Sequence, residues 1–364
     1  MNKALHRLLI ATSVIGMVLS MAACGDTTPA ADTTTTATTT TTTAADPTPT
    51  ETTTTTKPQP QYGINPLTGL ADMKTDNNRP VAIVVSDETS SLVQLGIDEA
   101  DMYFEAETEG GIPRMLCIFS SVDRVPDAIG PVRSARPHFV KMVKALDAIY
   151  GHVGGSPPGE LAIQNLGVKD IEDEAGIKHQ TLINSSNYSW NRTAFTKDKV
   201  LKAIQSKKYA TTTKTSSPFQ FGDKLGSDPA NTVDIKISTS FRMAFTYDAA
   251  KGVYQKHRNS LNTAVHKAAD GGVVEVSNVI VMLDNRFVDM TGAEGSTKTL
   301  YNFDLNSGSG YLATGGTVRE IKWKRTNNQL SYYEADGTTP LTVSEGKTYI
   351  ALISKDYKKD TKFY

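Results

Sequence analysis

The fold is decided by the stretch MYFEAETEGGIPRMLCIFSS, residues 102–121. Its first half alternates in polarity, so that Met102, Phe104 and Ala106 face one side of a strand and the glutamates face the other. Two glycines then turn the chain, and residues 114–121 return as a second strand. The pattern predicts a β-hairpin with a glycine-rich loop, whose glutamate-lined face opposes a strand beginning with Arg114.

The flanking sequence predicts further strands and one helix around this hairpin. Residues 81–85 (VAIVV) form a continuous apolar run, which is typical of a buried strand. After the hairpin, Pro137 stands in the first turn of a predicted helix whose apolar residues recur at helical spacing until about Ala148. Residues 149–153 predict another strand, and the glycine-rich loop HVGGSP, residues 152–157, follows it.

The second half of the chain reads as strands and turns. Residues 241–247, 273–283 and 318–325 are strand-like, and the β-branched run 273–283 is a candidate central strand. Glycine-containing turn signals separate short strands at 315–316 and 336–337. We therefore expect an α+β fold, with an N-terminal α+β domain at residues 61–216 and a β-rich C-terminal domain at residues 217–364.

The N-terminus has the layout of a signal peptide, residues 1–23. Basic residues come first, an apolar run follows from Leu8, and small residues precede Cys24. The run is shorter than the roughly 20 residues that span a hydrocarbon core of about 30 Å. Small residues before a cysteine resemble the lipobox of bacterial lipoproteins, in which the thiol is acylated and Cys24 becomes the first residue. The alternative is an ordinary secretory signal with an incidental cysteine.

Composition and charge exclude several classes of protein. Removing residues 1–23 would shift the formal charge from −1 to −3, which leaves no basic excess for nucleic-acid binding. Cys117 is the only other cysteine, so acylation of Cys24 excludes a disulfide within one chain and a cysteine-rich zinc site. Because Cys117 lies in an apolar strand-like run, we expect a buried, inert thiol rather than a nucleophile.

Residues 24–60 follow the signal peptide and read as a linker. They are rich in Thr, Ala, Pro and Asp and lack the large apolar residues that would form a core. Such a segment spans about 110 Å when fully extended and averages roughly 30–35 Å as a flexible coil. We expect a disordered tether that lifts a folded unit off the membrane; the alternative is a passive spacer.

Three arginines near glycine-rich loops predict an anion pocket. Arg114, Arg133 and Arg136 would hold phosphate or carboxylate groups. Ser134, backbone N–H groups at the predicted helix start, and the loop residues Gly154, Gly155 and Ser156 would complete the pocket. The alternative is a structural network of glutamates and arginines that fixes the hairpin against the helix.

The same region suggests acid–base or cation chemistry. Glu105 or Glu109 would act as a base, or would coordinate a divalent cation with His152. No other metal or cofactor is expected, because the remaining histidines show no metal-ligand spacing. The acidic run 172–174 reads as a solvated surface. Ser156 misses the Gly-x-Ser-x-Gly pattern of a nucleophile, and the two prolines after it oppose the required helix.

Three motifs resemble the YerB-like family of bacterial lipoproteins. They are EGGIPR at 109–114, IGPVRSAR at 129–136 and HVGGSP at 152–157, in this order. In the second half, NVIV at 278–281, WKR at 323–325 and GKTYI at 346–350 continue the resemblance. The family is built around domains of unknown function. The resemblance implies an α+β, layered sheet-and-helix sandwich without an assigned reaction.

Two classes of function remain. The first is a non-enzymatic binding module, anchored through lipid at the extracytoplasmic face of the bacterial membrane, for a cell-wall polymer or an envelope protein. The second is an envelope enzyme that acts on a phosphate- or pyrophosphate-bearing glycan through the arginine-lined pocket. Wall-polymer ligases of the LytR–CpsA–Psr type offer an analogy of site and location for the second class.

Overall fold

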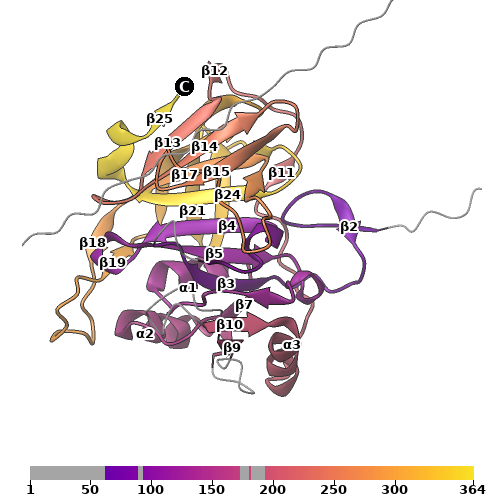
Figure 1. The fold of residues 1–364 in the computed structure, drawn as a ribbon, viewed down its shortest axis with the longest axis vertical. Coiled ribbons are helices and arrows are strands. Elements are labelled where there is room, and N and C mark those ends of the chain that lie inside the picture. Colours follow the sequence, from indigo (N-terminus) through magenta and orange to yellow (C-terminus); the bar gives the residue numbers. More distant parts are fainter. Residues whose placement is uncertain (1–61, 89–92, 173–179, 182–192) are drawn as a thin grey trace, which may run out of the picture. The chain divides into compact units, whose positions relative to one another are not determined.

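The predicted hairpin lies in the middle of a large mixed sheet (Figure 1). Strand β4 (Met102–Glu107) pairs with the antiparallel strand β5 (Pro113–Phe119), and the 3-10 turn η2 (Glu109–Gly111) joins them. The alternation predicted from the sequence is confirmed: Tyr103 packs into one hydrophobic core and Phe104 into another on the opposite face. The sheet therefore separates two packed layers.

The computed structural model describes residues 62–88, 93–172, 180–181 and 193–364. The predicted signal peptide, Cys24 and the linker of residues 24–60 lie outside the described residues. Among the described helices, none is both long enough and apolar enough to cross a membrane. Residues 60–364 form one compact unit.

The central sheet contains strands from both halves of the chain. In spatial order its strands are β12 (Asp228–Pro229), β21 (Thr317–Thr326), β20 (Ser307–Thr314), β17 (Asn278–Asp284), β24 (Thr348–Ser354), β4, β5, β3 (Val81–Ser86), β7 (Ile149–Gly151) and β8 (Lys169–Asp170). Strand β22 (Gln329–Glu334) also pairs with β21. The two halves meet where β24 pairs in parallel with β4, so one continuous sheet crosses the predicted boundary at residue 216.

A second sheet packs against one face of the central sheet. Its five antiparallel strands are β16 (Glu275–Val276), β15 (Val253–Arg258), β14 (Arg242–Asp248), β13 (Thr232–Lys236) and β25 (Lys362–Phe363). Phe245 and Tyr254 of this sheet share a core with Tyr103 and Tyr349, and helix α3 (Lys197–Ser206) contributes to the same core. Burying each large apolar side chain of this kind contributes roughly 1.5–3 kcal/mol.

The predicted strand at residues 273–283 is divided between the two sheets. Strand β16 ends at Val276 and belongs to the second sheet, whereas β17 begins at Asn278 in the central sheet. The chain passes from one layer to the other at Ser277. A continuous apolar run does not reveal this crossing, because both segments are buried.

Helices α1 (Pro137–Ala145) and α2 (Pro157–Leu166) pack together on the other face (Figure 1). Helix α1 buries Phe139 and Val143 against Phe104 and other residues of the central sheet. The predicted helix start at Pro137 is confirmed. The helix ends at Ala145 rather than near Ala148, because Asp147 has a positive φ of 49°.

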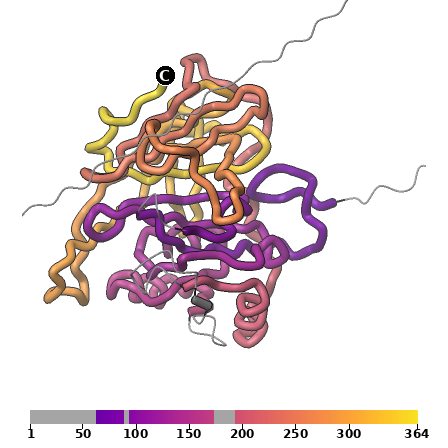
Figure 2. The backbone as a smooth tube through the Cα atoms, in the orientation of Figure 1, coloured from indigo at the N-terminus to yellow at the C-terminus, as the bar shows by residue number. Residues whose placement is uncertain are grey.

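Small sheets and 3-10 turns complete the described chain. The small sheets are β1 (Gly63–Ile64) with β2 (Ala71–Met73), β6 (Ala128–Ile129) with β10 (Thr193–Thr196) and β9 (Gln180–Thr181), β11 (Gln220–Phe221) with β23 (Thr342–Val343), and β18 (Arg286–Val288) with β19 (Tyr301–Phe303). The remaining 3-10 turns are η1 (Ile97–Glu99), η3 (Val122–Arg124) and η6 (Lys355–Asp360). The loop between β18 and β19 projects away from the body of the fold (Figure 2).

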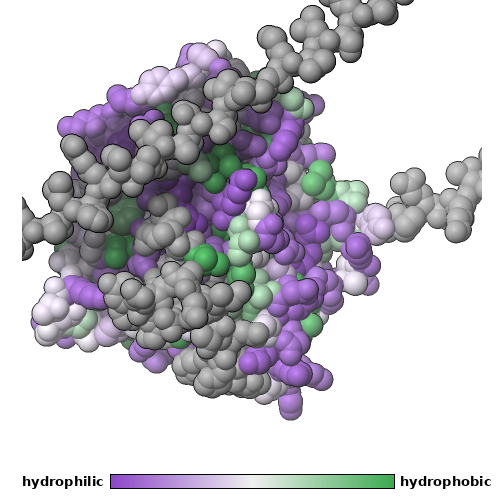
Figure 3. Space-filling model, in the orientation of Figure 1, coloured by the Kyte–Doolittle hydropathy of each residue, from purple (hydrophilic) through white to green (hydrophobic). Residues whose placement is uncertain are grey.

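Polar residues dominate the described surface in the view of Figure 3. Exposed large apolar side chains occur on different elements, for example Ile64 on β1, Leu225 before β12 and Val288 on β18. Single exposed apolar residues are normal on a globular protein. Converging polar groups, rather than an apolar patch, therefore mark the candidate functional site.

Candidate functional site

The candidate site lies at one edge of the central sheet, where strands from both halves of the chain end. Strands β3, β4, β7 and β24 run in the same direction, so their carboxyl ends reach the same edge. Ligands of open sheets with parallel strands bind outside these ends. The predicted glycine-rich loops after β4 and β7 both open here.

Residues 130–136 cross this edge between β3 and β7. The N–H of Arg133 donates a hydrogen bond to the carbonyl of Val84 (2.8 Å), and the carbonyl of Arg133 accepts one from the N–H of Val153 (3.0 Å). These backbone hydrogen bonds hold residues 130–136 in place, the segment in which the sequence predicted part of the anion pocket. They place Arg133, Ser134 and Arg136 beside the loop that follows β7.

Glu109 is the centre of the arginine cluster. Nη2 of Arg114 lies 2.5 Å from Oε1 of Glu109. Arg136 binds the same carboxylate through two nitrogens, Nε at 2.8 Å and Nη2 at 2.5 Å. Nη1 of Arg114 also donates to the carbonyl of Ser134 (2.7 Å). A bidentate guanidinium–carboxylate pair of this kind is strong and directional, so the structural network considered as an alternative is present.

Burial and neighbouring charges determine the ionisation of these groups. Burial raises the pKa of Glu109, but Arg114 and Arg136 outweigh it and hold that pKa well below its usual range. Burial, together with the neighbouring Arg136, lowers the pKa of Arg114 to about 9. Both members of the Arg114–Glu109 pair are therefore charged at neutral pH.

Charges of both signs act on Arg133. Burial lowers the pKa of Arg133, and the charges that act on it include Glu88, Glu109 and Arg136. Because Glu109 also binds Arg114 and Arg136, three guanidiniums gather at this edge. Gathered guanidiniums favour an anionic ligand.

The two glycines of the loop after β7 suit its conformation and its close approach to α2. Gly154 has a positive φ of 65°, which side chains rarely adopt, and it lies beside the hydroxyl of Ser134. A Cβ on Gly155 would stand 2.6 Å from Cγ of Glu160 on α2. The backbone of the loop therefore lies next to residues 130–136, the arginine segment, with no loop side chain in between.

Ser156 caps a helix, which corrects one expectation. Its hydroxyl oxygen accepts a hydrogen bond from the N–H of Gly159 (3.2 Å), and α2 begins at the next residue. The argument that Pro157 and Pro158 oppose a helix was wrong. Proline is favoured in the first turn, where its missing N–H needs no partner.

Glu105 lies apart from the predicted pocket, which corrects its assignment. It projects from β4 into the layer of the second sheet, where Lys256 and Tyr349 contact it. Arg114 projects from β5 toward the opposite layer, so the expected pairing of Glu105 with His152 is not formed. Burial raises the pKa of Glu105 to about 7, although Lys256 opposes this shift.

The buried cluster around Glu105 was missed by the sequence reasoning. Nζ of Lys256 donates to Oδ2 of Asp87 (2.8 Å) and contacts Nδ1 of His266 (3.2 Å). Burial raises the pKa of Asp87, but Lys256, His266 and Arg258 outweigh it and lower that pKa below its usual range. His266 was expected to be a packing or surface residue and is fully buried. Nothing in the sequence spacing indicates that these residues meet.

His152 contacts its own loop and residues at the end of the neighbouring strand β8. Its Nδ1 lies 2.9 Å from the carbonyl of Gly154, and its Nε2 lies 3.4 Å from Oδ2 of Asp170. Glu172 accepts a hydrogen bond from the N–H of Gly154. The description of Glu172 as a solvated surface residue is therefore corrected: it is partly buried at the candidate site. Asp173 and Glu174 lie outside the described residues.

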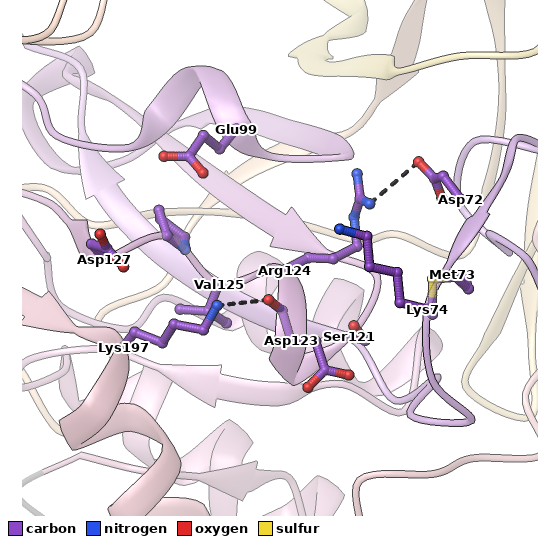
Figure 4. Close-up of a pocket in the computed structure, with 11 residues that line it drawn as sticks. Asp72, Met73, Lys74, Glu99, Ser121, Asp123, Arg124, Val125, Asp127 and Lys197 are labelled. Atoms are coloured by element: carbon purple, nitrogen blue, oxygen red, sulfur yellow. Dashed lines mark hydrogen bonds and ion pairs between the residues drawn. The ribbon is translucent and has the colours of Figure 1, made fainter. Parts of the chain in front are cut away.

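A separate hollow of about 480 Å³ opens at the opposite edge of the sheet (Figure 4). Residues of both charges line it, including Glu99, Asp127 and Lys197. The bridge from Arg124 to Asp72 (3.2 Å) compensates part of this charge, and Lys197 donates to the carbonyl of Asp123 (2.7 Å). None of the site residues predicted from the sequence lines this hollow, and its mixed charge does not favour one class of ligand.

The chain is similar to proteins whose function has not been assigned. The domain described as "Protein of unknown function (DUF3048) N-terminal domain" matches residues 67–211, and the corresponding C-terminal domain matches residues 233–350. The chain is 29% identical over 304 residues to YerB of Bacillus subtilis (strain 168), named as a candidate lipoprotein. This match covers 79% of the chain and 85% of the relative.

The fold is also similar to a solved structure. The crystal structure of the YerB protein from Bacillus subtilis matches with a TM-score of 0.69 and 26% sequence identity. The match covers 82% of this chain and 98% of the YerB chain. The expected α+β class and the layered arrangement of sheets and helices are confirmed. With both domains matched in order and the solved fold shared, the chain belongs to the YerB-like family.

Proposed function

We propose that this chain is a lipid-anchored envelope protein whose folded part binds an anionic cell-wall polymer without changing it chemically. The anchor is supported by the lipobox-like sequence that ends at Cys24 and by the similarity to a relative named as a lipoprotein. The observation that carries the binding role is the gathering of Arg114, Arg133 and Arg136 beside the glycine-rich loop after β7.

The groups that the sequence offered for catalysis are committed to other roles. Glu109 is held as a carboxylate by two guanidiniums, which makes it a weak base. The Ser156 hydroxyl caps α2. Cys117 is buried, and burial raises the pKa of its thiol well above the usual value, so that it stays protonated. These assignments support binding over nucleophilic chemistry.

Anionic wall polymers fit the charge and the location of this site. Phosphate-bearing polymers carry repeated negative charges that match guanidinium donors in geometry. A tether of residues 24–60 would hold the site some tens of ångströms from the bilayer. Nucleic acid is not an expected partner, because the formal charge of the whole chain is −1.

Retention on purified wall tests this proposal. The full-length chain, purified in detergent, is incubated with phosphate-bearing wall polymer and with the same polymer after removal of its phosphate groups. We expect retention on the first only, and a decrease with rising salt because the contact is electrostatic. Arg133→Gln should reduce retention about tenfold, which corresponds to about 1.4 kcal/mol.

The matched control removes a positive charge elsewhere. Lys324 is exposed on β21, so Lys324→Gln should leave retention unchanged. The variant Arg133→Gln keeps the Arg114–Glu109–Arg136 bridges, and its folding is checked by circular dichroism. We call the edge that carries Arg114, Arg133 and Arg136 the arginine edge. Equal retention of Arg133→Gln and Lys324→Gln would refute its binding role. Equal retention of the wild-type chain on both polymers would refute it as well.

A second candidate function is an enzyme that acts on a pyrophosphate-bearing glycan. It is favoured by one observation, the His152–Asp170–Glu172 cluster next to the arginine segment. Release of phosphate or transfer of glycan by the purified chain, abolished in Arg133→Gln, would support this alternative over simple binding.

A further inference from the structure

His152, Asp170 and Glu172 converge where β7 and β8 end. Each residue offers one ligand atom, and these atoms all lie within 4.8 Å of one another. The side chain of His152 is almost fully buried, with 1% of its surface exposed, whereas the two carboxylates are about a quarter exposed. The cluster therefore has a buried nitrogen ligand at its base and carboxylates on its open side.

The hydrogen bond of His152 determines which ring nitrogen can bind a cation; Nε2 faces Asp170, whereas Oε2 of Glu172 lies 3.9 Å from Nδ1. Nδ1 lies 2.9 Å from the carbonyl of Gly154. A carbonyl only accepts, so Nδ1 carries a hydrogen. In the neutral ring, Nε2 then holds a lone pair, which points toward Oδ2 of Asp170 at 3.4 Å. Within the described part of the chain, this buried Nε2 has no hydrogen-bond partner.

Two acceptors that face each other at this distance repel unless a positive charge lies between them. Either a proton on Nε2 or a metal cation meets this requirement. A tetrahedral ion with bonds of about 2.1 Å separates its ligand atoms by about 3.4 Å. The Nε2–Oδ2 distance of 3.4 Å equals that separation.

The surrounding groups orient all three ligands. Gly154 accepts from Nδ1 of His152 and donates its own N–H to Glu172. Nζ of Lys207 lies 3.7 Å from Oδ1 of Asp170, the oxygen that does not face His152. Such outer contacts fix ring tautomer and carboxylate orientation in metal sites.

We propose that His152, Asp170 and Glu172 bind a divalent metal ion of the Mn²⁺ or Zn²⁺ type. One imidazole and two carboxylates form a mixed nitrogen–oxygen set, which suits these ions better than Ca²⁺ or Mg²⁺, whose ligands are oxygens. Three protein ligands leave coordination positions for water or for a ligand. The site differs from the sequence-based expectation, which paired His152 with glutamates of the hairpin.

The metal site would adjoin the arginine edge through a shared backbone. Gly154, whose carbonyl and N–H orient two of the ligands, also accepts a hydrogen bond from the N–H of Ala135 (2.9 Å). A phosphate oxygen at this edge would meet a metal ion from one side and a guanidinium from the other. The metal proposal does not depend on such a ligand, because the ion is held by protein groups alone.

Metal binding is tested on the full-length chain, purified in detergent and treated with a chelator that is then removed. Mn²⁺ is titrated and followed by electron paramagnetic resonance, and Zn²⁺ is titrated by calorimetry. We expect one saturable site per chain for at least one of these ions. Binding should also raise the midpoint of thermal unfolding, because the ion binds the folded state.

Two substitutions locate the site and one controls for general charge effects. Asp170→Asn and His152→Gln should each weaken binding at least about tenfold. Asp198→Asn removes an exposed carboxylate from α3 and should leave affinity unchanged. Circular dichroism checks the folding of each variant.

Absence of saturable binding of either ion to the wild-type chain would overturn the proposal and would favour a proton between His152 and Asp170. Binding of equal affinity in Asp170→Asn and Asp198→Asn would overturn it as well. The titration of the wild-type chain tests the metal proposal even if a variant fails to fold. Wall-polymer retention measured with chelator present reports on the arginine edge separately, so failure of one proposal does not imply failure of the other.

Discussion

Replacing Glu109 with glutamine removes the carboxylate that Arg114 and Arg136 share. The substitution keeps the size of the side chain and one acceptor oxygen, but it leaves the two guanidiniums without their negative partner. The side chains of Arg114, Arg136 and Glu109 are only 3%, 8% and 13% exposed, so water screens this charge weakly. We therefore expect this one substitution to lower the free energy of unfolding substantially.

The size of the loss follows from the burial of the pair. Removing one partner of a buried ion pair costs about 3–5 kcal/mol. The retained oxygen places Glu109→Gln at the lower end, at about 3 kcal/mol. With a urea dependence of about 3 kcal/mol/M, the unfolding midpoint should fall by about 1 M.

The difference in stability between wild type and Glu109→Gln should also depend on pH. Arg114 and Arg136 outweigh the effect of burial and hold the folded-state pKa of Glu109 below its usual value of 4.5. Its stabilising contribution is therefore complete above that value and is lost as the pH falls through the folded pKa. The gap between wild type and Glu109→Gln should narrow on acidification.

Urea unfolding of the full-length chain, followed by tryptophan fluorescence and circular dichroism, measures these effects. Repeating it with sodium pyrophosphate tests anion binding by the guanidiniums, since an anion that binds the folded state should stabilise Glu109→Gln more than wild type. Asp198→Asn is the control. A midpoint for Glu109→Gln equal to that of the control would refute the buried charge pair. Equal stabilisation of both proteins by pyrophosphate would refute anion binding by these guanidiniums.

Substitutions at three further residues test other parts of the fold by the same urea assay. Phe139→Ala removes a fully buried ring between α1 and the central sheet and should cost about 3–5 kcal/mol; a cost below that of a surface mutation would contradict this packing. Ser156→Ala removes the cap of α2 and should cost about 1 kcal/mol, whereas Ser156→Gly should cost less. Glu105 has a pKa raised from 4.5 to about 7, so its contribution to stability should decline as the pH rises through that range. Glu105→Gln should flatten this decline, and an unchanged pH profile would show that Glu105 does not titrate there.

The sequence predicted those parts of the fold in which neighbouring residues carry the information. The hairpin of β4 and β5 was predicted because polarity alternates on one strand and glycines mark the turn. The arginine edge was predicted because its residues lie in loops that directly follow strands. Helix α1 was predicted from apolar spacing and Pro137, and only its end differed.

The parts that the sequence did not predict depend on distant residues. Lys256 and Asp87 are 169 positions apart, and nothing in either local pattern indicates their contact. Asp170 belongs to a two-residue strand, which is too short to give a period. The division of residues 273–283 between two sheets was also invisible, because burial on both sides removes alternation.

The pairing of β24 with β4 has a consequence for how this chain acquires its structure. Strand β24 follows β4, β17, β20, β21 and β22 in the sequence, yet it lies between β17 and β4 in the middle of the central sheet. A chain that emerges from a membrane pore with its N-terminus first would expose the edges of β4 and β17 until β24 follows. The central sheet would therefore stay incomplete until β24 has crossed, and a copy stalled before this strand would expose unpaired strand edges to proteolysis and aggregation.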